Sequence, residues 1–101
     1  MRLSAQQTKA ILDATAELAG AGARVLLFGS RLDDSVRGGD IDLLVQCPEP
    51  VDRPVVLAAN IEARLQIALG EQRIDVLVID PVTALQPVHR VALRTGQELL
   101  A

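Results

Sequence analysis

Two aspartates separated by one residue, Asp40 and Asp42, are the residues of this chain best suited to chemistry. They open an apolar segment that predicts a strand, and residues two apart on a strand project from the same face. A third aspartate, Asp75, lies in another apolar segment, 74–79, which also predicts a strand. Three carboxylates in one site repel each other, and a divalent cation relieves that repulsion. Since Mg²⁺ prefers hard oxygen ligands, the pattern predicts a magnesium site.

A turn of small residues precedes the acidic pair. The apolar segment 24–28 predicts a strand, and Gly29 and Ser30 follow it directly. Glycine allows the backbone to approach phosphate oxygens closely, and the amides of the turn point toward such anions. The Ser30 hydroxyl and the Arg31 guanidinium are further candidates for phosphate contacts. This is not a Walker A loop, because no G-x-x-x-x-G-K-[ST] pattern occurs.

The turn and the acids together indicate nucleotide chemistry. Two metal ions about 3.5–4 Å apart clamp the attacking and leaving oxygens of an in-line phosphoryl displacement. Asp40 and Asp42 are placed to bridge such ions from one strand. Asp75 on a neighbouring strand would complete the site where the incoming nucleophile loses its proton. No His/Cys cluster competes for a zinc assignment, since the chain has one residue of each type.

The elements that must position these residues follow the order α-β-β-α-β-α. The first helix is predicted from a capping box at Ser4–Gln7 and a stop at Gly20, and Pro54 lies near the start of the second. The remaining elements are strands at 24–28, from 40 onward and at 74–79, and helices at about 55–69 and 87–95. The predicted buried positions of the first helix are Ile11, Ala14 and Leu18, with Ala10 as a further candidate. Those of the second are Val56 or Leu57, Ile61, Leu65 and Ala68. We therefore expect an α/β (α+β) fold, a mixed sheet packed with helices, forming one domain over residues 1–101.

The composition restricts the ligand. The net charge is −3, nine of the ten basic residues are scattered arginines, and one Phe is the entire aromatic content, so binding to a nucleic-acid backbone is not expected.

No signal peptide is recognisable, and the longest apolar run, 55–59, is far shorter than the ~20 residues that span a bilayer. A cytoplasmic protein is expected, with Cys47 as a packing residue. A chain this small also stands to gain from a partner subunit, including a second copy, that covers an apolar face.

Gly29-Ser30, a gap of nine residues, Asp40-Ile41-Asp42-Leu43 and a later Asp75 resemble the signature of polymerase-beta-type nucleotidyltransferases. The resemblance covers nearly the whole chain. The length and the ending 88–96 are similar to the minimal nucleotidyltransferase (MNT) branch, whose members are often paired with a HEPN-domain protein as antitoxin and toxin.

The resemblance implies an enzyme with two Mg²⁺ ions that cleaves ATP, or another NTP, between the α and β phosphates. It then moves the nucleoside monophosphate to a hydroxyl, which in such antitoxins is a tyrosine of the partner ribonuclease. Carried over by position, Asp40 and Asp42 would hold both metals, Asp75 would activate the acceptor and complete the metal site, and Gly29 and Ser30 would hold the β and γ phosphates. Arg31 would add positive charge.

Two other functions stay open at this point. The chain could neutralise a partner by occlusion without catalysis, or it could transfer a nucleotide to a small molecule such as an aminoglycoside. His89, Arg90 and Arg94 on the last helix are candidates for nucleotide or partner contacts, although an exposed polar role is favoured for His89. The sequence itself does not select the nucleotide.

Overall fold

The computed structural model describes residues 3–29, 40–70 and 72–100. Ser30 and Arg31, the two further candidates for phosphate contacts, therefore lie outside the described residues. The elements are α1 (Ala5–Ala19), β1 (Arg24–Phe28), β2 (Asp40–Gln46), α2 (Pro54–Leu69), β3 (Arg73–Ile79), α3 (Pro87–Thr95) and β4 (Gln97–Glu98). The predicted α+β class and the predicted order of helices and strands are confirmed, with β4 as an addition.

The four strands form one mixed sheet in the order β3-β2-β1-β4. Strands β2 and β3 run parallel, and β1 pairs antiparallel with both β2 and β4. Because β1 runs opposite to its neighbour, its carboxyl end lies beside the amino-terminal ends of β2 and β3. The turn after β1 and the acidic starts of the other two strands are thereby brought to the same edge of the sheet.

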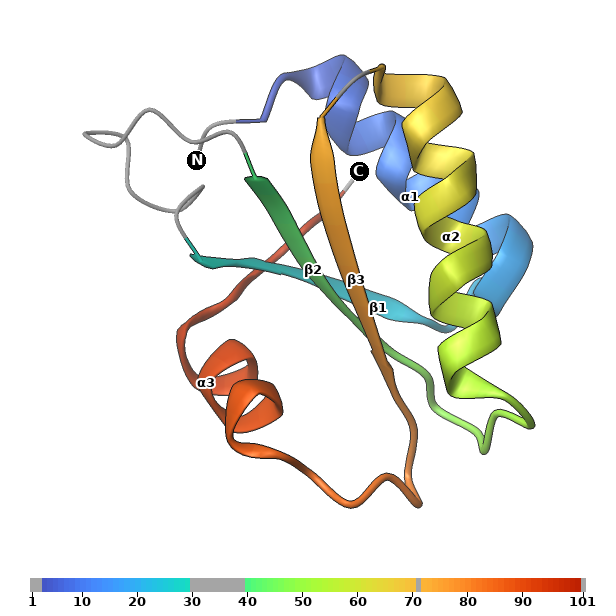
Figure 1. Cartoon of the computed structure of the whole chain (residues 1–101), viewed down its shortest axis with the longest axis vertical. Helices are drawn as coiled ribbons and strands as arrows, with labels where there is room; N and C mark the ends of the chain where they lie inside the picture. Colours follow the sequence, from blue (N-terminus) through green and yellow to red (C-terminus); the bar gives the residue numbers. More distant parts are fainter. Residues whose placement is uncertain (1–2, 30–39, 71, 101) are drawn as a thin grey trace.

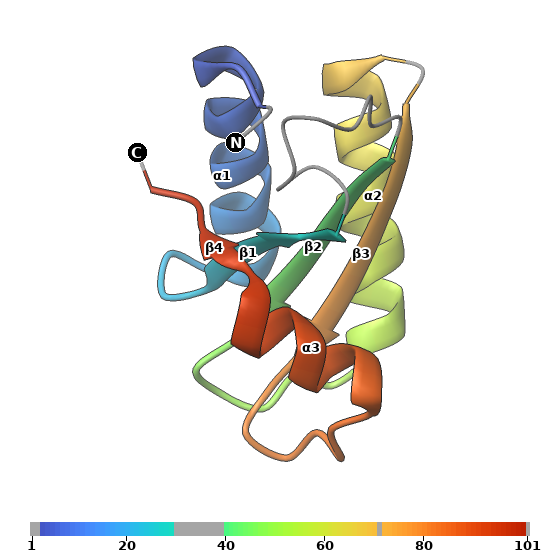
Figure 2. The same ribbon diagram turned by 90° about the vertical axis from the view of Figure 1, so that its left-hand side faces the viewer.

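Helices α1 and α2 cover one face of the sheet, while α3 lies against the other (Figures 1 and 2). The covered face holds the main core, in which alternate strand residues meet the apolar stripes of the two helices. Its fully buried side chains include Ile11, Leu27, Ile41, Leu43, Val45, Ile61 and Leu65. The period-two alternation of β2 therefore directs Ile41, Leu43 and Val45 into this core and leaves Asp40 and Asp42 on the opposite face.

The second face has a smaller core, formed by Leu26, Leu44, Ile79 and Ala92. Helix α3 supplies Ala92 to this cluster and covers the carboxyl-terminal half of β2 more than its start. The acidic residues at the start of β2 thus share a face with a packed helix but are not buried beneath it. Asp42 is partly buried and Asp75 is exposed.

The helix ends match the sequence signals. Ser4 and Gln7 form the capping box, with the Gln7 amide donating to Ser4 Oγ at 3.0 Å, and Gly20, Gly70 and Gly96 end the three helices. In the predicted stripe of α1, Ile11 and Ala14 are buried and Leu18 is partly buried against the core.

One position of the predicted α2 stripe is wrong. Ile61 and Leu65 are buried, and Leu57, one of the two alternatives Val56 or Leu57, is partly buried against the core. Ala68 is exposed. The helix is apolar on most of its surface, so periodicity alone does not choose the side that packs on β3.

Within the described residues, no helix combines the length and apolar character needed to cross a bilayer.

Asp80 joins two loops at the end of β3. Its carboxylate is buried and accepts hydrogen bonds from the Val51 amide at 2.8 Å, the Val82 amide at 3.0 Å and Thr83 Oγ1 at 2.9 Å. These donors, the Val51 amide first, hold the pKa of the Asp80 carboxyl below its ordinary value. The charged form of Asp80 therefore fastens the loop before α2 to the loop after β3.

Replacing Asp80 by Asn should lower the melting temperature at pH 7 by about 5–10 °C, because an amide cannot accept at both positions. A depressed native pKa contributes stability that is fully present above about pH 4, the unfolded value, and is lost as the pH falls through the native pKa. The difference in Tm between wild type and Asp80→Asn should therefore shrink as the pH is lowered below about 4, as thermal melts at a series of pH values would measure. Asp52→Asn, whose side chain is fully exposed, is the control. A Tm difference that stays constant over this range would contradict the assignment.

Candidate functional site

Asp42 and Asp75 are direct neighbours on adjacent parallel strands. The register pairs Asp42 with Asp75 across β2 and β3, and it pairs Phe28 with Asp42 across β1 and β2. Paired residues of neighbouring strands project from the same face, about 4.8 Å apart. The predicted association of Asp75 with the acidic pair is thus consistent with the strand register. Asp40 lies two residues before Asp42 on this same face.

Gly29 lies directly against the Asp42 carboxylate. It follows β1 with a φ of +78°, a backbone conformation that residues with a side chain rarely adopt. A Cβ added at this position would clash with Asp42 Oδ2 and would lie 3.3 Å from Asp42 Cγ. The glycine therefore serves two purposes here, since it permits the turn and leaves space for the carboxylate.

The carboxyl of Asp42 has a pKa above its ordinary value. Burial contributes most to this shift, followed by the negative charges of Asp75 and Asp40, while the Arg73 guanidinium acts in the opposite direction. Burial and neighbouring carboxylates both disfavour the ionised form, and a bound cation would favour it. The Asp42 carboxylate thus meets the electrostatic condition expected of a group that binds a positively charged ligand.

Arg73 is a member of this group that the sequence analysis did not identify. The register places Arg73 opposite Asp40, and its Nε lies 3.7 Å from Oδ2 of Asp75. The available signal was the Arg-x-Asp spacing at the start of β3, since two residues at this spacing share a strand face. Recognising its relation to Asp40 also required the register between β2 and β3.

The donor set fits Mg²⁺ in chemistry, since carboxylate oxygens are its preferred protein ligands. Among the described residues, however, no three His, Cys, Asp or Glu side chains converge closely enough to form a ready metal site. What the described residues provide is the adjacent pair Asp42 and Asp75, with Asp40 beside it. Mg²⁺ commonly takes one or two carboxylates and completes its shell with water and substrate phosphate, so this pair suffices as a protein contribution.

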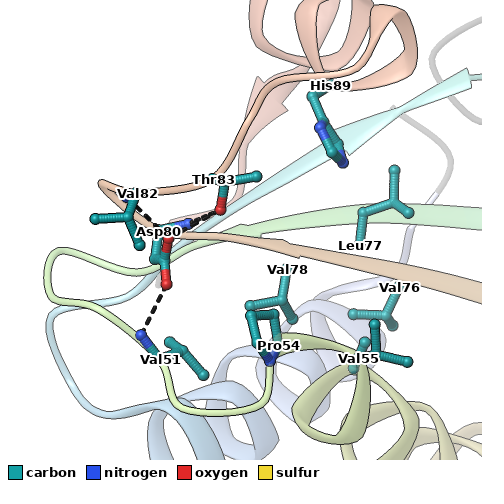
Figure 3. A pocket seen from close by; sticks show the side chains of 11 residues that line it. Val51, Pro54, Val55, Val76, Leu77, Val78, Asp80, Val82, Thr83 and His89 are labelled. Carbon is teal, nitrogen blue, oxygen red and sulfur yellow. Dashed lines mark hydrogen bonds between the residues drawn. The ribbon is translucent and has the colours of Figure 1, made fainter.

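A cavity of about 570 Å³ lies beside the carboxyl-terminal half of β3 (Figure 3). Its walls are mostly apolar and come from the loop before α2, the start of α2, β3 and the loop before α3. They include Val51, Pro54, Val55, Val76, Val78 and Val82. Asp80 and Thr83 also line it, already bonded to each other. This cavity contains none of Asp40, Asp42 and Asp75, so it is a separate feature of the molecule.

His89 lines the same cavity, and its side chain caps the start of α3. It is partly buried, and its Nδ1 accepts a hydrogen bond from the Gln86 amide at 3.0 Å, which caps the start of α3. The expectation of an exposed polar residue was therefore incorrect for His89, although Arg90 and Arg94 are exposed. Cys47 is a buried core residue whose thiol pKa is raised by burial and then by Asp80, in agreement with the predicted packing role.

The comparison with protein families agrees with this geometry. The family model described as "Nucleotidyltransferase domain" matches residues 8–97, which include the three aspartates and the turn before them. The chain therefore belongs to the nucleotidyltransferase domain family, and it is a transferase of that broad class. No curated protein matches the chain.

Proposed function

We propose that this protein is a Mg²⁺-dependent nucleotidyltransferase that moves a nucleoside monophosphate, AMP from ATP, to a hydroxyl group of a protein partner. The observation that carries the proposal is the row formed by Asp42 and Asp75 beside the closely fitting Gly29, in a chain of the nucleotidyltransferase domain family. The similarity of the sequence to minimal nucleotidyltransferases extends the proposal to an antitoxin that AMPylates a HEPN-domain ribonuclease.

In this proposal Asp40, Asp42 and Asp75 hold two Mg²⁺ ions. When bound, such ions supply positive charge that stabilises the developing charge on the attacking and leaving oxygens. In this proposal Gly29 lets the backbone approach the triphosphate, Gly29 and Ser30 hold the β and γ phosphates, and Arg31 adds positive charge. The raised pKa of Asp42 supports this reading, because its carboxylate gains from a cation.

Asp75 is the proposed general base, which takes the proton from the attacking hydroxyl group. Its side chain is 52% exposed, so an acceptor hydroxyl can reach it from solvent without any rearrangement of the core. The hydroxyl oxygen forms a bond to the α phosphorus, the bond from that phosphorus to the bridging oxygen breaks, and pyrophosphate leaves. The hydroxyl proton passes to an Asp75 carboxylate oxygen.

The test is intact mass spectrometry of the candidate HEPN partner after incubation with this protein, ATP and Mg²⁺. We expect a gain of one or more AMP groups on the partner, and no gain when EDTA removes the metal. GTP, CTP and UTP in parallel reactions identify the nucleotide. A second set of reactions with aminoglycosides, without the protein partner, tests transfer to small molecules.

A stable complex with no gain in mass would contradict the transferase proposal and would favour neutralisation by occlusion. The two functions also differ in cells. If Asp40→Asn/Asp42→Asn still protects cells from the toxin, protection comes from binding, whereas loss of protection with an intact complex supports catalysis.

A further inference from the structure

Arg73 occupies one corner of a group of four side chains on one face of the sheet. The parallel register places Asp40 opposite Arg73 and, two residues on, Asp42 opposite Asp75. All four side chains project from the same face, because positions two apart on a strand share a face. The guanidinium is therefore a near neighbour of the acidic group as a whole, and its Nε lies 3.7 Å from Asp75 Oδ2.

The charges of this group indicate what Arg73 does. Three carboxylates and one guanidinium leave the group with two net negative charges when all are ionised, so the arginine offsets part of the repulsion. An Arg guanidinium stays protonated throughout the physiological pH range. It is thus a permanent cation at the place where, on the proposed function, a metal ion also binds.

The ion pair between Arg73 and Asp75 can be broken at little cost in stability. The side chain of Arg73 is 73% exposed and that of Asp75 is 52% exposed, so the guanidinium can move into water without leaving an unpaired buried charge. Exposed ion pairs of this type contribute little to stability. A divalent ion at Asp75 would also repel the arginine.

We propose that Arg73 is the internal counter-ion of this carboxylate group, and that a divalent cation must displace it from Asp75 in order to bind. The inference rests on the proposed function, because it takes the aspartates as metal ligands. Arg73 is a positioning residue in this scheme, since it acts through Asp75. The positive charge of Arg73 reduces the repulsion between the three carboxylates in the metal-free protein. The same charge weakens the binding of a metal ion in the absence of nucleotide.

The experiment measures the affinity of the purified chain for Mn²⁺ alone, by electron paramagnetic resonance of the free ion, so that no catalysis is needed. Arg73→Gln should bind Mn²⁺ about three- to tenfold more tightly than wild type, because a competing cation is removed. Arg73→Lys retains the charge and should stay within about twofold of wild type. Circular dichroism establishes that each variant is folded.

Arg64→Gln is the matched control. Arg64 is also an ion-paired arginine, with Nη1 at 2.7 Å from Glu17 Oε2, but it connects α2 to α1 on the far face of the sheet. Its loss changes the net charge equally and should leave the Mn²⁺ affinity within about twofold of wild type. A purely structural role for Arg73 would lower stability without tightening Mn²⁺ binding.

The outcomes separate this inference from the proposed function. If wild type binds Mn²⁺ and Arg73→Gln binds it equally or more weakly, the counter-ion role is wrong and the metal site stands. If neither wild type nor Arg73→Gln binds Mn²⁺, the metal site fails and the counter-ion role fails with it. Tighter binding by Arg73→Gln, with Arg73→Lys and Arg64→Gln unchanged, supports both.

Discussion

Asp42→Asn is expected to reduce nucleotidyl transfer by about a thousandfold or more while leaving the fold intact. The substitution removes a negative charge from the proposed metal site, and the amide oxygen that remains is a weaker metal ligand than a carboxylate. Stabilisation of transition-state charge by metal is worth several kcal/mol, and each 1.4 kcal/mol corresponds to about a factor of ten in rate. The measurement is pyrophosphate release from NTP in the presence of the acceptor and Mg²⁺.

Stability provides the internal check on this variant. Burial and the neighbouring charges of Asp75 and Asp40 disfavour the charged form of Asp42 in the metal-free protein. The neutral Asn should therefore leave the metal-free Tm equal to or above that of wild type. It should also lose the increase in Tm that we expect Mg²⁺ to produce in wild type. Asp13→Asn serves as the control, since its exposed carboxylate pairs with Lys9 on α1. Transfer at the wild-type rate by folded Asp42→Asn would rule out the proposed role of this carboxylate.

Much of the fold could be predicted because local signals and burial agree. The alternation of β2 separates Ile41, Leu43 and Val45 from the aspartates, and the structure buries all three in the main core. Helix boundaries were similarly accessible, since a capping box, a proline at the first turn and a glycine at the end are local signals that favour helix termini. These features depend on neighbours in the sequence, so they need no knowledge of the tertiary structure.

Features that depend on strand pairing were not accessible. Strand β4 is two residues long, too short to show any periodicity, and exists because Gln97 and Glu98 pair with β1 after α3 has turned the chain back. Thr15 is buried in α1 although its hydroxyl has no hydrogen-bond partner among the described residues. Nothing in the local sequence distinguishes it from an exposed polar helix residue.

The site shows the same division. The sequence predicted Asp40, Asp42 and Asp75 from spacing and residue type, and the register of β2 and β3 places Asp42 and Asp75 side by side. It did not predict Arg73, because Arg73 and Asp40 are neighbours only through the pairing of β2 with β3. The two residues are 33 positions apart in the sequence. Nor did it predict how tightly the glycine after β1 fits against Asp42, which is a matter of packing across strands.

Gly29→Ala should impair both folding and catalysis, by two mechanisms that can be separated. At φ +78° any side chain strains the backbone, which costs about 1–3 kcal/mol. The added methyl group would also clash with Asp42 Oδ2, so either the turn or the carboxylate must move. Because a displacement of about 1 Å at a reacting centre can cost a hundredfold in rate, we expect transfer to fall about a hundredfold in addition to the loss of stability.

Gly70→Ala is the matched control for this prediction. Gly70 has nearly the same φ, +83°, but a Cβ there would meet nothing within 4 Å. It should lose stability to a similar degree, measured by denaturant unfolding, and retain transfer activity at temperatures where it is folded. If Mg²⁺ binds at the proposed site and raises the Tm, that increase should be smaller in Gly29→Ala alone, because only there does an added Cβ crowd the Asp42 carboxylate. Equal activity of the two folded variants would show that the space beside Asp42 has no catalytic significance, and that the glycine is required only for the turn.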